Sequence, residues 1–260
     1  MSFTMILVTG LGAAIGLMTM VWVVSLVRRD ASIVDIFWGL GFVLLAWIYQ
    51  SLGEADDIRS LLVPGLVTLW GCRLAAYIAM RGRGRGEDYR YAAMRERGGR
   101  AFAWRSLGTV FWLQATILWV VAMPRAQVQR GGGPAALTWL DAVGLLLFGV
   151  GLFFEAVGDY QMARFKADPA NRGQVMDRGL WRYTRHPNYF GDCLVWWGLT
   201  LPVLATPGGW WTLLSPILMT FLLLRVSGVA LLEKGMHSSK PHYRDYVRRT
   251  SAFVPWPPRD

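Results

Sequence analysis

The stretch from Gly179 to Asp192 reads Gly-Leu-Trp-Arg-Tyr-Thr-Arg-His-Pro-Asn-Tyr-Phe-Gly-Asp, and a run of apolar residues follows it directly. The residue before a proline favours extended backbone, whereas Pro187 itself suits the first turn of a helix. We therefore expect a helix to begin near Pro187 and to carry Asn188 and Asp192 on one face, because residues four apart lie one turn apart. So much hydrogen-bonding capacity beside an apolar helix indicates either an anchor at the lipid headgroups or a ligand site.

The composition is that of a membrane protein. The chain has 260 residues, of which 54% are hydrophobic and 14 are tryptophan, and long uncharged runs recur along it. About 20 apolar residues are enough to cross a bilayer. The formal net charge is +10, but the basic residues lie between apolar runs rather than on one soluble face, which argues against a nucleic-acid partner. We predict an all-α integral membrane protein with a single domain over residues 1–260.

Seven transmembrane helices are predicted, at about residues 5–27, 32–52, 61–80, 106–123, 136–157, 190–205 and 210–232. Lysine and arginine crowd the loops after the first, third, fifth and seventh, whereas the alternate loops hold only Arg59, Arg125 and Arg130. The positive-inside rule then places the amino terminus outside and the carboxyl terminus in the cytoplasm, and we expect a bacterial inner membrane. The first helix is expected to be an anchor, not a removable signal peptide, and its Gly12-x-x-x-Gly16 to be a close helix-packing face.

The most specific motif is Arg185-His186-Pro187-Asn188-Tyr189 with Gly191-Asp192. It resembles the signature shared by membrane steroid 5α-reductases, sterol C14- and C7-type reductases and isoprenylcysteine carboxyl methyltransferases. The chain is most similar to the bacterial branch of the steroid 5α-reductase family, over most of its length and most sharply from about Glu155 onward. This resemblance implies an NADPH-dependent reductase of the 3-oxo-5α-steroid 4-dehydrogenase type, acting on the C4–C5 double bond of 3-oxo-Δ4 steroids or a similar apolar enone.

Two other classes stay open. Methyltransferases that use S-adenosylmethionine on lipid or prenylated substrates share the Arg-His-Pro signature, and a non-catalytic lipid-binding membrane protein would also fit. No metal site is expected, because the three histidines are scattered and Cys72 and Cys193 lie in or beside the predicted helices.

The cofactor is expected on the fifth to seventh helices and the C-terminal tail. NADPH is a polyanion, so arginine forks and tyrosine hydroxyls suit its phosphates and ribose groups. In the reductases that the chain resembles, the positions that match Asp159, Asn188 and Asp192 contact the cofactor, whereas Glu155 matches an asparagine of the eukaryotic enzymes and its role is open. The residues predicted to bind the cofactor are Asp159, Arg164, Lys166, Arg182, Tyr183, Arg185, His186, Asn188, Tyr189, Asp192, Arg225, His242, Tyr243, Tyr246 and Arg249.

Two parts of this set have alternatives. Ser239 can cap a short tail helix on which His242, Tyr246 and Arg249 share one face, and that face either closes over the cofactor or lies at the membrane interface. Arg225, expected to be buried in the seventh helix, is either a partner for an inward acid or a phosphate contact.

The substrate is expected to enter from the lipid into a cavity among the first four helices. Hydride addition to an enone puts negative charge on the carbonyl oxygen, which calls for a proton donor or a strong hydrogen bond there. We predict Asp35, Trp38 and Tyr77 at this position. Apolar surroundings would favour a protonated Asp35, although an acid at a helix start also suits the helix dipole and can pair with Arg28 or Arg29. The Gln-Glu pair of the eukaryotic reductases is absent from the second helix, and Trp70 stands where they carry a tyrosine.

Overall fold

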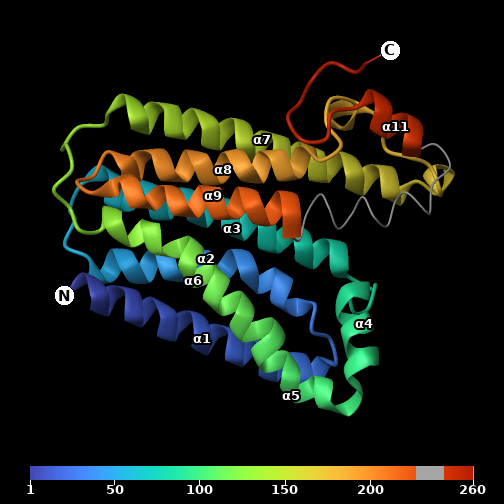
Figure 1. Ribbon diagram of the computed structural model, residues 1–260, viewed down its shortest axis with the longest axis horizontal. Helices are drawn as coiled ribbons and strands as arrows, with labels where there is room; N and C mark the ends of the chain where they lie inside the picture. Colours follow the sequence, from blue (N-terminus) through green and yellow to red (C-terminus); the bar gives the residue numbers. More distant parts are fainter. Residues whose placement is uncertain (227–242, 260) are drawn as a thin grey trace. The chain divides into compact units, whose positions relative to one another are not determined.

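The computed structural model describes residues 1–226 and 243–259. The described chain is helical and contains no strand, apart from an isolated parallel bridge between Thr184 and Ser251. Figure 1 shows these helices in the order of the sequence. The chain divides into two compact units. Unit 1 comprises Met1–Thr138 and Pro202–Thr212, and unit 2 comprises Trp139–Leu201 and Leu213–Asp260. The first boundary, between Thr138 and Trp139, falls at the start of the fifth predicted transmembrane helix, and the segment Pro202–Thr212 returns to unit 1.

Unit 1 is built around α2, which packs against α1, α3 and α6. Its elements are α1 (Phe3–Arg28), α2 (Ile33–Leu52), α3 (Ile58–Gly82), α4 (Tyr89–Gly98), η1 (Gly99–Ala101), α5 (Phe102–Ser106), the π-helical η2 (Leu107–Trp112) and α6 (Leu113–Val128). The backbones of α2 and α3 touch, because a Cβ at Gly39 would lie 2.6 Å from the carbonyl oxygen of Gly71. A side chain at either position would separate the two helices.

The packing predicted for Gly12 and Gly16 is wrong. A Cβ added at either glycine would meet nothing within 4 Å, whereas one at Gly10 would lie 2.4 Å from the hydroxyl oxygen of Tyr49. The small-residue pattern indicated that α1 allows a close approach, but not which glycine faces the neighbouring helix. In this helix the close contact is made with an aromatic ring instead of a backbone.

Unit 2 is built around α7 (Trp139–Ala167) and α8 (Pro187–Leu204). A Cβ at Gly191 would lie 2.5 Å from the carbonyl oxygen of Gly151, and one at Gly198 would lie 2.5 Å from the backbone nitrogen of Phe148. The two backbones therefore touch along two turns. The helix α8 begins at Pro187, as predicted. The other elements of this unit are η3 (Pro169–Asn171), η4 (Gly179–Arg182), α9 (Leu214–Phe221), η6 (Leu222–Val226) and α11 (Tyr243–Arg249), whereas most of η5 (Gly209–Leu213) belongs to unit 1.

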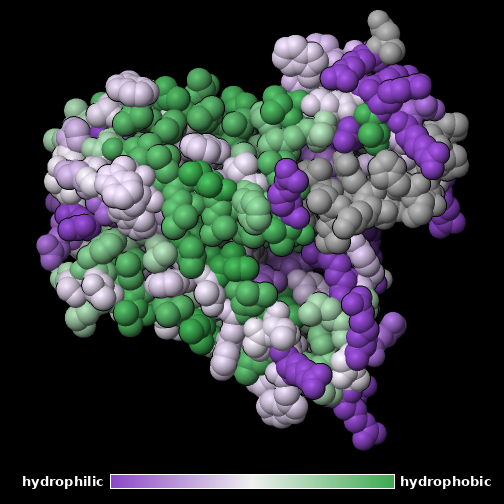
Figure 2. All heavy atoms as spheres, in the orientation of Figure 1, coloured by the Kyte–Doolittle hydropathy of each residue, from purple (hydrophilic) through white to green (hydrophobic). Residues whose placement is uncertain are grey.

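Within the described residues, six helical segments are long and apolar enough to cross a membrane. They are Phe3–Arg28, Ile33–Leu52, Ile58–Gly82, Tyr89–Val128, Trp139–Ala167 and Gly209–Val226. Hydrophobic side chains cover α7 and α9, whereas hydrophilic ones gather on α4 and on the C-terminal segment (Figure 2). The helix α8 is not among the six, and residues 227–232 of the seventh predicted helix lie outside the described chain. A multi-pass membrane protein is thus supported, while the count of seven and the orientation stay predictions.

Two arginines that were counted as loop charges are buried inside unit 1. Arg59 is 0% exposed and donates to the carbonyl oxygens of Pro134 and Ala136, and the second of these bonds is 2.6 Å long. Arg125, in α6, is 4% exposed and donates to the carbonyl oxygen of Val121 at 2.7 Å. Arg59 therefore holds the segment that follows α6. Of the three basic residues in the alternate loops, Arg130 alone is exposed.

Candidate functional site

The first half of the Gly179–Asp192 stretch is docked on α7. The indole nitrogen of Trp181 donates to the carbonyl oxygen of Gly158 at 3.1 Å, and the backbone nitrogen of Leu180 donates to the side-chain oxygen of Gln161 at 3.0 Å. Gly179 has a φ of 58°, in the left-handed region, and a Cβ there would lie 2.5 Å from the side chain of Gln161. Glycine therefore suits this turn for both its conformation and its size.

The C-terminal segment is bound to the same stretch by backbone groups. The backbone nitrogen of Arg185 donates to the carbonyl oxygen of Ser251 at 2.9 Å, and that of Trp256 donates to the carbonyl oxygen of Tyr183 at 3.0 Å. The hydroxyl group of Thr184 donates to the carbonyl oxygen of Phe253 at 2.8 Å. Three consecutive residues of the motif thus fix the course of the last part of the chain.

Two residues predicted to bind the cofactor make structural contacts here. The buried guanidinium group of Arg185 donates to the carbonyl oxygens of Val247, at 3.1 Å, and Thr250, at 2.7 Å, at the end of α11. The hydroxyl group of Tyr246 donates to the carbonyl oxygen of Trp181 at 2.5 Å. Together these two side chains attach α11 to η4. Their hydrogen bonds therefore help to hold the site in shape.

His186 lies at the turn into α8 and is 1% exposed. Its backbone nitrogen donates to the hydroxyl oxygen of Thr184 at 3.3 Å, and its ring stacks on that of Tyr189, with centroids 5.7 Å apart and an interplanar angle of 14°. The stacked pair covers the first turn of α8. His186 is therefore placed as part of the buried frame, beside the polar residues that follow it.

The polar residues at the crossing of α7 and α8 form the candidate cofactor site. The side-chain nitrogen of Asn188 donates to Asp159 at 3.2 Å, across 29 residues of sequence. The Asn188 side-chain oxygen is buried and has no hydrogen-bond partner within the described ranges. One turn along α8, Asp192 accepts from the indole nitrogen of Trp196 at 3.1 Å. Glu155 is buried on α7, where its backbone lies against Gly191. Asp159 and Asn188, 29 residues apart in sequence, thus meet at this crossing, and Asp192 lies one turn further along α8.

The other predicted cofactor residues are spread over unit 2. On α7, Arg164 and Lys166 are exposed, and Arg164 donates to the hydroxyl group of Tyr160 at 3.2 Å. Arg182, Tyr183 and Arg249 are exposed beside the docked segments, and Tyr243 is buried with its ring 6.0 Å from that of Tyr246. Arg225 is exposed on η6, so the prediction that it is buried is wrong. The predictions for Ser239 and His242 fall outside the described residues.

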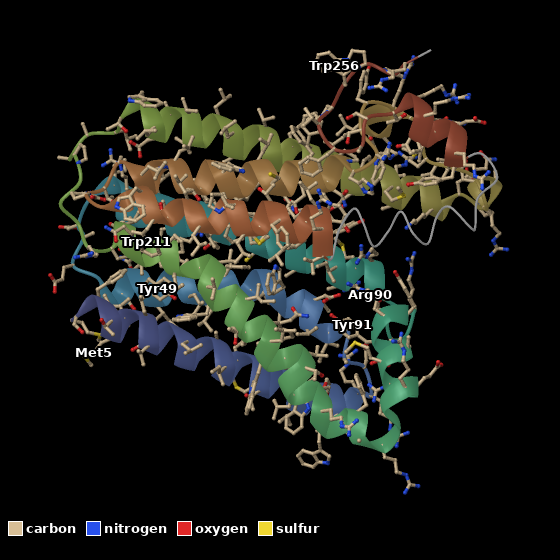
Figure 3. All side chains as sticks on the ribbon, viewed as in Figure 1. Met5, Tyr49, Arg90, Tyr91, Trp211 and Trp256 are labelled. Carbon is tan, nitrogen blue, oxygen red and sulfur yellow. The ribbon has the colours of Figure 1, made fainter. Side chains whose placement is uncertain are left out.

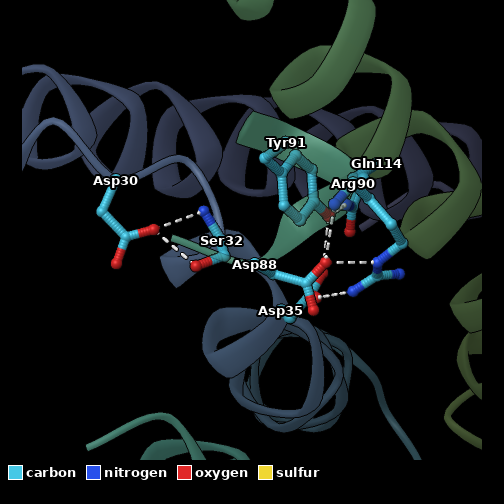
Figure 4. Close-up of polar contacts among 7 residues, drawn as sticks. All are labelled: Asp30, Ser32, Asp35, Asp88, Arg90, Tyr91 and Gln114. Carbon is cyan, nitrogen blue, oxygen red and sulfur yellow. Dashed lines mark hydrogen bonds and ion pairs between the residues drawn. The ribbon is translucent and has the colours of Figure 1, made fainter. Parts of the chain in front are cut away.

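The residues predicted at the substrate carbonyl lie in unit 1, where Asp35 belongs to a charged cluster (Figure 4). One Asp35 oxygen accepts from the guanidinium group of Arg90 at 2.7 Å and the other accepts from the hydroxyl group of Tyr91 at 2.7 Å. Arg90 also donates to Asp88 at 2.8 Å, and the side-chain nitrogen of Gln114 donates to the Tyr91 hydroxyl at 3.2 Å. Both oxygens of Asp35 are therefore engaged as acceptors, and the cation is Arg90 instead of Arg28 or Arg29.

Arg90 and Tyr91 were missed because they lie in a loop whose many arginines had been attributed to topology. The signal was the pair Glu87-Asp88 within that basic run, and Asp88 caps α4 by accepting from the backbone nitrogen of Arg90 at 3.0 Å. The labelled side chains of Arg90 and Tyr91 lie at one end of unit 1, and those of Tyr49 and Trp211 lie toward the other (Figure 3).

A second ion pair closes the same end of unit 1. Arg95 donates two hydrogen bonds to Glu87, at 2.8 and 2.9 Å, and Glu87 also accepts from the backbone nitrogen of Ala31 at 2.7 Å. Burial alone would raise the pKa of Glu87, but the bonds from Arg95 and Ala31 outweigh it and lower the pKa. Burial opposes the same change at Asp88, whose pKa is lowered by Arg90 and then Arg81. The loop between α3 and α4 is thereby held against the turn between α1 and α2.

Trp38 contacts an aromatic ring, and Tyr77 contacts a cation. The ring of Trp38 meets that of Phe42 edge-on, with centroids 5.2 Å apart, and Phe42 in turn contacts Trp70 at 5.7 Å. The guanidinium carbon of Arg81 lies 5.6 Å from the centroid of the Tyr77 ring. Trp70, expected at the position of a reductase tyrosine, is fully buried, so it is placed as part of the core of unit 1.

Comparison with known proteins identifies relatives over most of the chain. The model of a family described as "Protein of unknown function (DUF1295)" matches residues 21–250. An uncharacterised protein of Schizosaccharomyces pombe is 27% identical over 281 residues, which cover 95% of this chain and 79% of that protein. The probable O-methyltransferase ustE of Ustilaginoidea virens is 34% identical over 73 residues, 28% of this chain and 26% of that protein. No solved structure matches the chain.

Proposed function

Because this chain belongs to the DUF1295 family, which is related to steroid 5α-reductase-like membrane proteins, we propose that it is an NADPH-dependent membrane reductase. Its substrate is a 3-oxo-Δ4 steroid or a similar apolar enone. In the steroid, the bond that is reduced is the C4–C5 double bond. The motif from Arg185 to Asp192 supports this assignment through its resemblance to the reductases. The same resemblance marks Asp159, Asn188 and Asp192 as cofactor contacts.

The observation that carries the proposal is the meeting of Asp159 and Asn188. A buried polar atom without a partner costs about 1–3 kcal/mol, and most buried polar atoms in folded proteins have a partner, so an atom without one indicates a place where a ligand or an ordered water can bind. The Asn188 oxygen is buried and has no partner in the part of the chain that the structure describes. It fits a ligand that offers an N–H donor, as the carboxamide of a nicotinamide does. Asp159 holds the Asn188 side chain from its other end.

The remaining residues have two roles: some hold the site in shape, and others are proposed to contact the cofactor. When bound, NADPH supplies the hydride. Arg185 and Tyr246 hold α11 and η4 in place, whereas the exposed Arg182, Tyr183 and Arg249 offer charges and a hydroxyl group to the phosphates and ribose. In unit 1 the proposal revises the role of Asp35, because its two oxygens already accept from Arg90 and Tyr91. Tyr77 is the residue that we now assign as hydrogen-bond donor to the substrate carbonyl.

The proposal includes seven transmembrane helices, with α8 as the sixth, and a cytoplasmic carboxyl terminus in a bacterial inner membrane. Burial of Arg59 and Arg125 supports this orientation, since it leaves Arg130 as the exposed basic residue of the alternate loops. The basic segments with tyrosine and histidine then face the cytoplasm, where NADPH is available.

A methyltransferase that uses S-adenosylmethionine is the second candidate. It is favoured by the 34% identity with a probable O-methyltransferase, although that match spans only 28% of this chain. S-adenosylmethionine carries no phosphate, so it would make fewer hydrogen bonds with the same exposed arginines than NADPH would.

The two candidates are separated by the thermal unfolding of the purified protein in a neutral detergent, with either cofactor added. A ligand that binds only the folded state raises its stability by RT ln(1 + [L]/Kd), or about 2.7 kcal/mol at a hundredfold excess over Kd. The reductase proposal expects NADPH to raise the unfolding temperature and S-adenosylmethionine to leave it unchanged. The opposite result would transfer the assignment to the methyltransferase.

A further inference from the structure

A pocket of about 390 Å³ lies in unit 2 between the end of α11 and the last residues of the described chain. Its lining includes Arg185, Arg248, Arg249 and Arg259, together with the hydroxyl residues Thr250 and Ser251, and it contains no acidic residue. Trp256, which is 67% exposed, also lines it, and its labelled side chain projects from the C-terminal segment (Figure 3). Four arginines thus border one small space.

The pocket is held in shape by bonds that do not use the side chains of its exposed arginines. Arg185 fixes the end of α11 through the carbonyl oxygens of Val247 and Thr250. The backbone nitrogen of Arg259 donates to the carbonyl oxygen of Arg249 at 2.9 Å and closes the loop. The wall is therefore formed before any ligand arrives, which reduces the ordering cost of binding.

The lining residues carry positive charge and no acid. Arg248 pairs with Asp245, which lies outside the lining, at 3.3 Å, and both side chains are mostly exposed. Such a pair is screened by solvent and contributes little. Arg249 and Arg259 are exposed and border the same space, and positive charge on both favours an anion there.

We propose that this pocket binds the phosphate group of an organic ligand. Arginine recognises phosphate with paired, charge-assisted hydrogen bonds, and the hydroxyl groups of Thr250 and Ser251 can add neutral ones. Trp256 offers a flat ring beside the charge, which suits a nucleotide base or the glycerol region of a phospholipid. Two sources share this chemistry: the 2′-phosphate of NADPH, which rests on the proposed function, and an anionic lipid headgroup, which does not.

The test compares two probes on the purified full-length protein in neutral detergent. Adenosine 2′,5′-bisphosphate represents the nucleotide source, and phosphatidylglycerol, with phosphatidylcholine as its zwitterionic control, represents the lipid source. The variant is the double substitution Arg249→Gln, Arg259→Gln, which removes two exposed charges and leaves Arg185 in place. Arg244→Gln is the matched control, because Arg244 is exposed on the same helix but does not line the pocket.

At least one probe is expected to raise the unfolding temperature of the wild type and of Arg244→Gln. Its affinity should fall by about tenfold or more in the double variant, because charge-assisted hydrogen bonds are lost. A loss confined to the bisphosphate identifies the nucleotide, and a loss confined to phosphatidylglycerol identifies the lipid. The proposal is overturned if neither probe stabilises the wild type, or if the double variant and Arg244→Gln respond equally. The reductase proposal is tested separately: it fails if NADPH does not raise the unfolding temperature of the wild type.

Discussion

At the scale of single residues, the role proposed for Asn188 can be tested most directly. Asn188→Ala removes the buried oxygen that has no partner in the described chain and the amide that Asp159 accepts from. We expect the affinity for NADPH to fall by about tenfold, because one buried hydrogen bond contributes on the order of 1 kcal/mol and more when its loss leaves a partner unsatisfied. Binding is measured as the rise in unfolding temperature over a titration of NADPH.

Gln174→Ala is the control for this variant. Gln174 is an exposed amide of the same unit and bonds to the carbonyl oxygen of Ala170. Its replacement should leave NADPH binding unchanged. Equal stabilisation of both variants by NADPH, with normal folding, would remove the crossing of α7 and α8 from the cofactor site.

Asp35→Asn distinguishes a structural acid from a catalytic one. The ion pair with Arg90 is partly exposed, so its loss should cost about 1 kcal/mol and lower the unfolding temperature by roughly 2–4 °C. Turnover of an enone should fall less than tenfold, because the acid is already engaged as an acceptor by two donors. A fall on the order of 10²-fold without a change in unfolding temperature would restore the proton-donor role, since that is the scale for losing one positioned acid.

The residue types of the signature predicted which side chains can donate hydrogen bonds, but not which groups accept them. Arg185 and Tyr246 were expected to contact a ligand, yet their side chains donate to backbone carbonyl groups 62 to 65 residues away. Sequence shows that such a donor is available but not which distant acceptor takes it. Asp159 and Asn188 could be placed because the resemblance marked both positions and Pro187 fixed where α8 begins.

At the scale of elements, α7 and α8 depend on glycine. A Cβ at Gly191 would lie 2.5 Å from backbone atoms of Glu155 and Gly151, and neither backbone can move without separating the helices. Gly191→Ala should therefore cost about 1–3 kcal/mol, the usual range for forcing extra volume into a packed interface. Gly149→Ala, on the same helix pair, meets nothing within 4 Å and should be neutral or slightly stabilising. Equal unfolding temperatures for the two variants would contradict the close packing.

The loop between α3 and α4 should respond to acid. The lowered pKa values of Glu87 and Asp88 mean that the folded state binds protons less readily than the unfolded state. Their contribution to stability is complete above their usual values of 4.5 and 3.8 and is lost as the pH falls through the lower folded values. Unfolding temperatures between pH 6 and pH 3 should drop more steeply for the wild type than for Glu87→Gln. Parallel curves would show that the Glu87–Arg95 pair contributes nothing.

Helix packing shows a limit of sequence patterns at this scale. Gly12 and Gly16 matched a known close-packing spacing but lie open, whereas Gly151, Gly191 and Gly198 make the close contacts. A small residue permits contact on one side of a helix, and the partner helix decides which side is used. The helices themselves were predictable because length and hydropathy are local properties, although α4 was hidden within a loop rich in arginine.

At the scale of the whole molecule, the orientation in the membrane is testable with single cysteines. Asp56, between α2 and α3, and Glu96, in α4, both lie at exposed positions and are each replaced by cysteine. The exposed native Cys72 is first replaced by serine. An impermeant thiol reagent added to intact cells should label Asp56→Cys and should not label Glu96→Cys. The reverse pattern would place the proposed cofactor site on the side of the membrane without NADPH.

The central claim is hydride transfer from NADPH to an enone, and isotope transfer measures it most directly. Membranes containing the protein are incubated with a 3-oxo-Δ4 steroid and NADPH that carries deuterium at the transferred position, and the products are analysed by mass spectrometry. Hydride adds to the β-carbon of an enone, so the account predicts a reduced product with one deuterium at C5, and a much smaller yield from Asn188→Ala. An unreduced steroid, together with a methylated lipid when S-adenosylmethionine replaces NADPH, would contradict it.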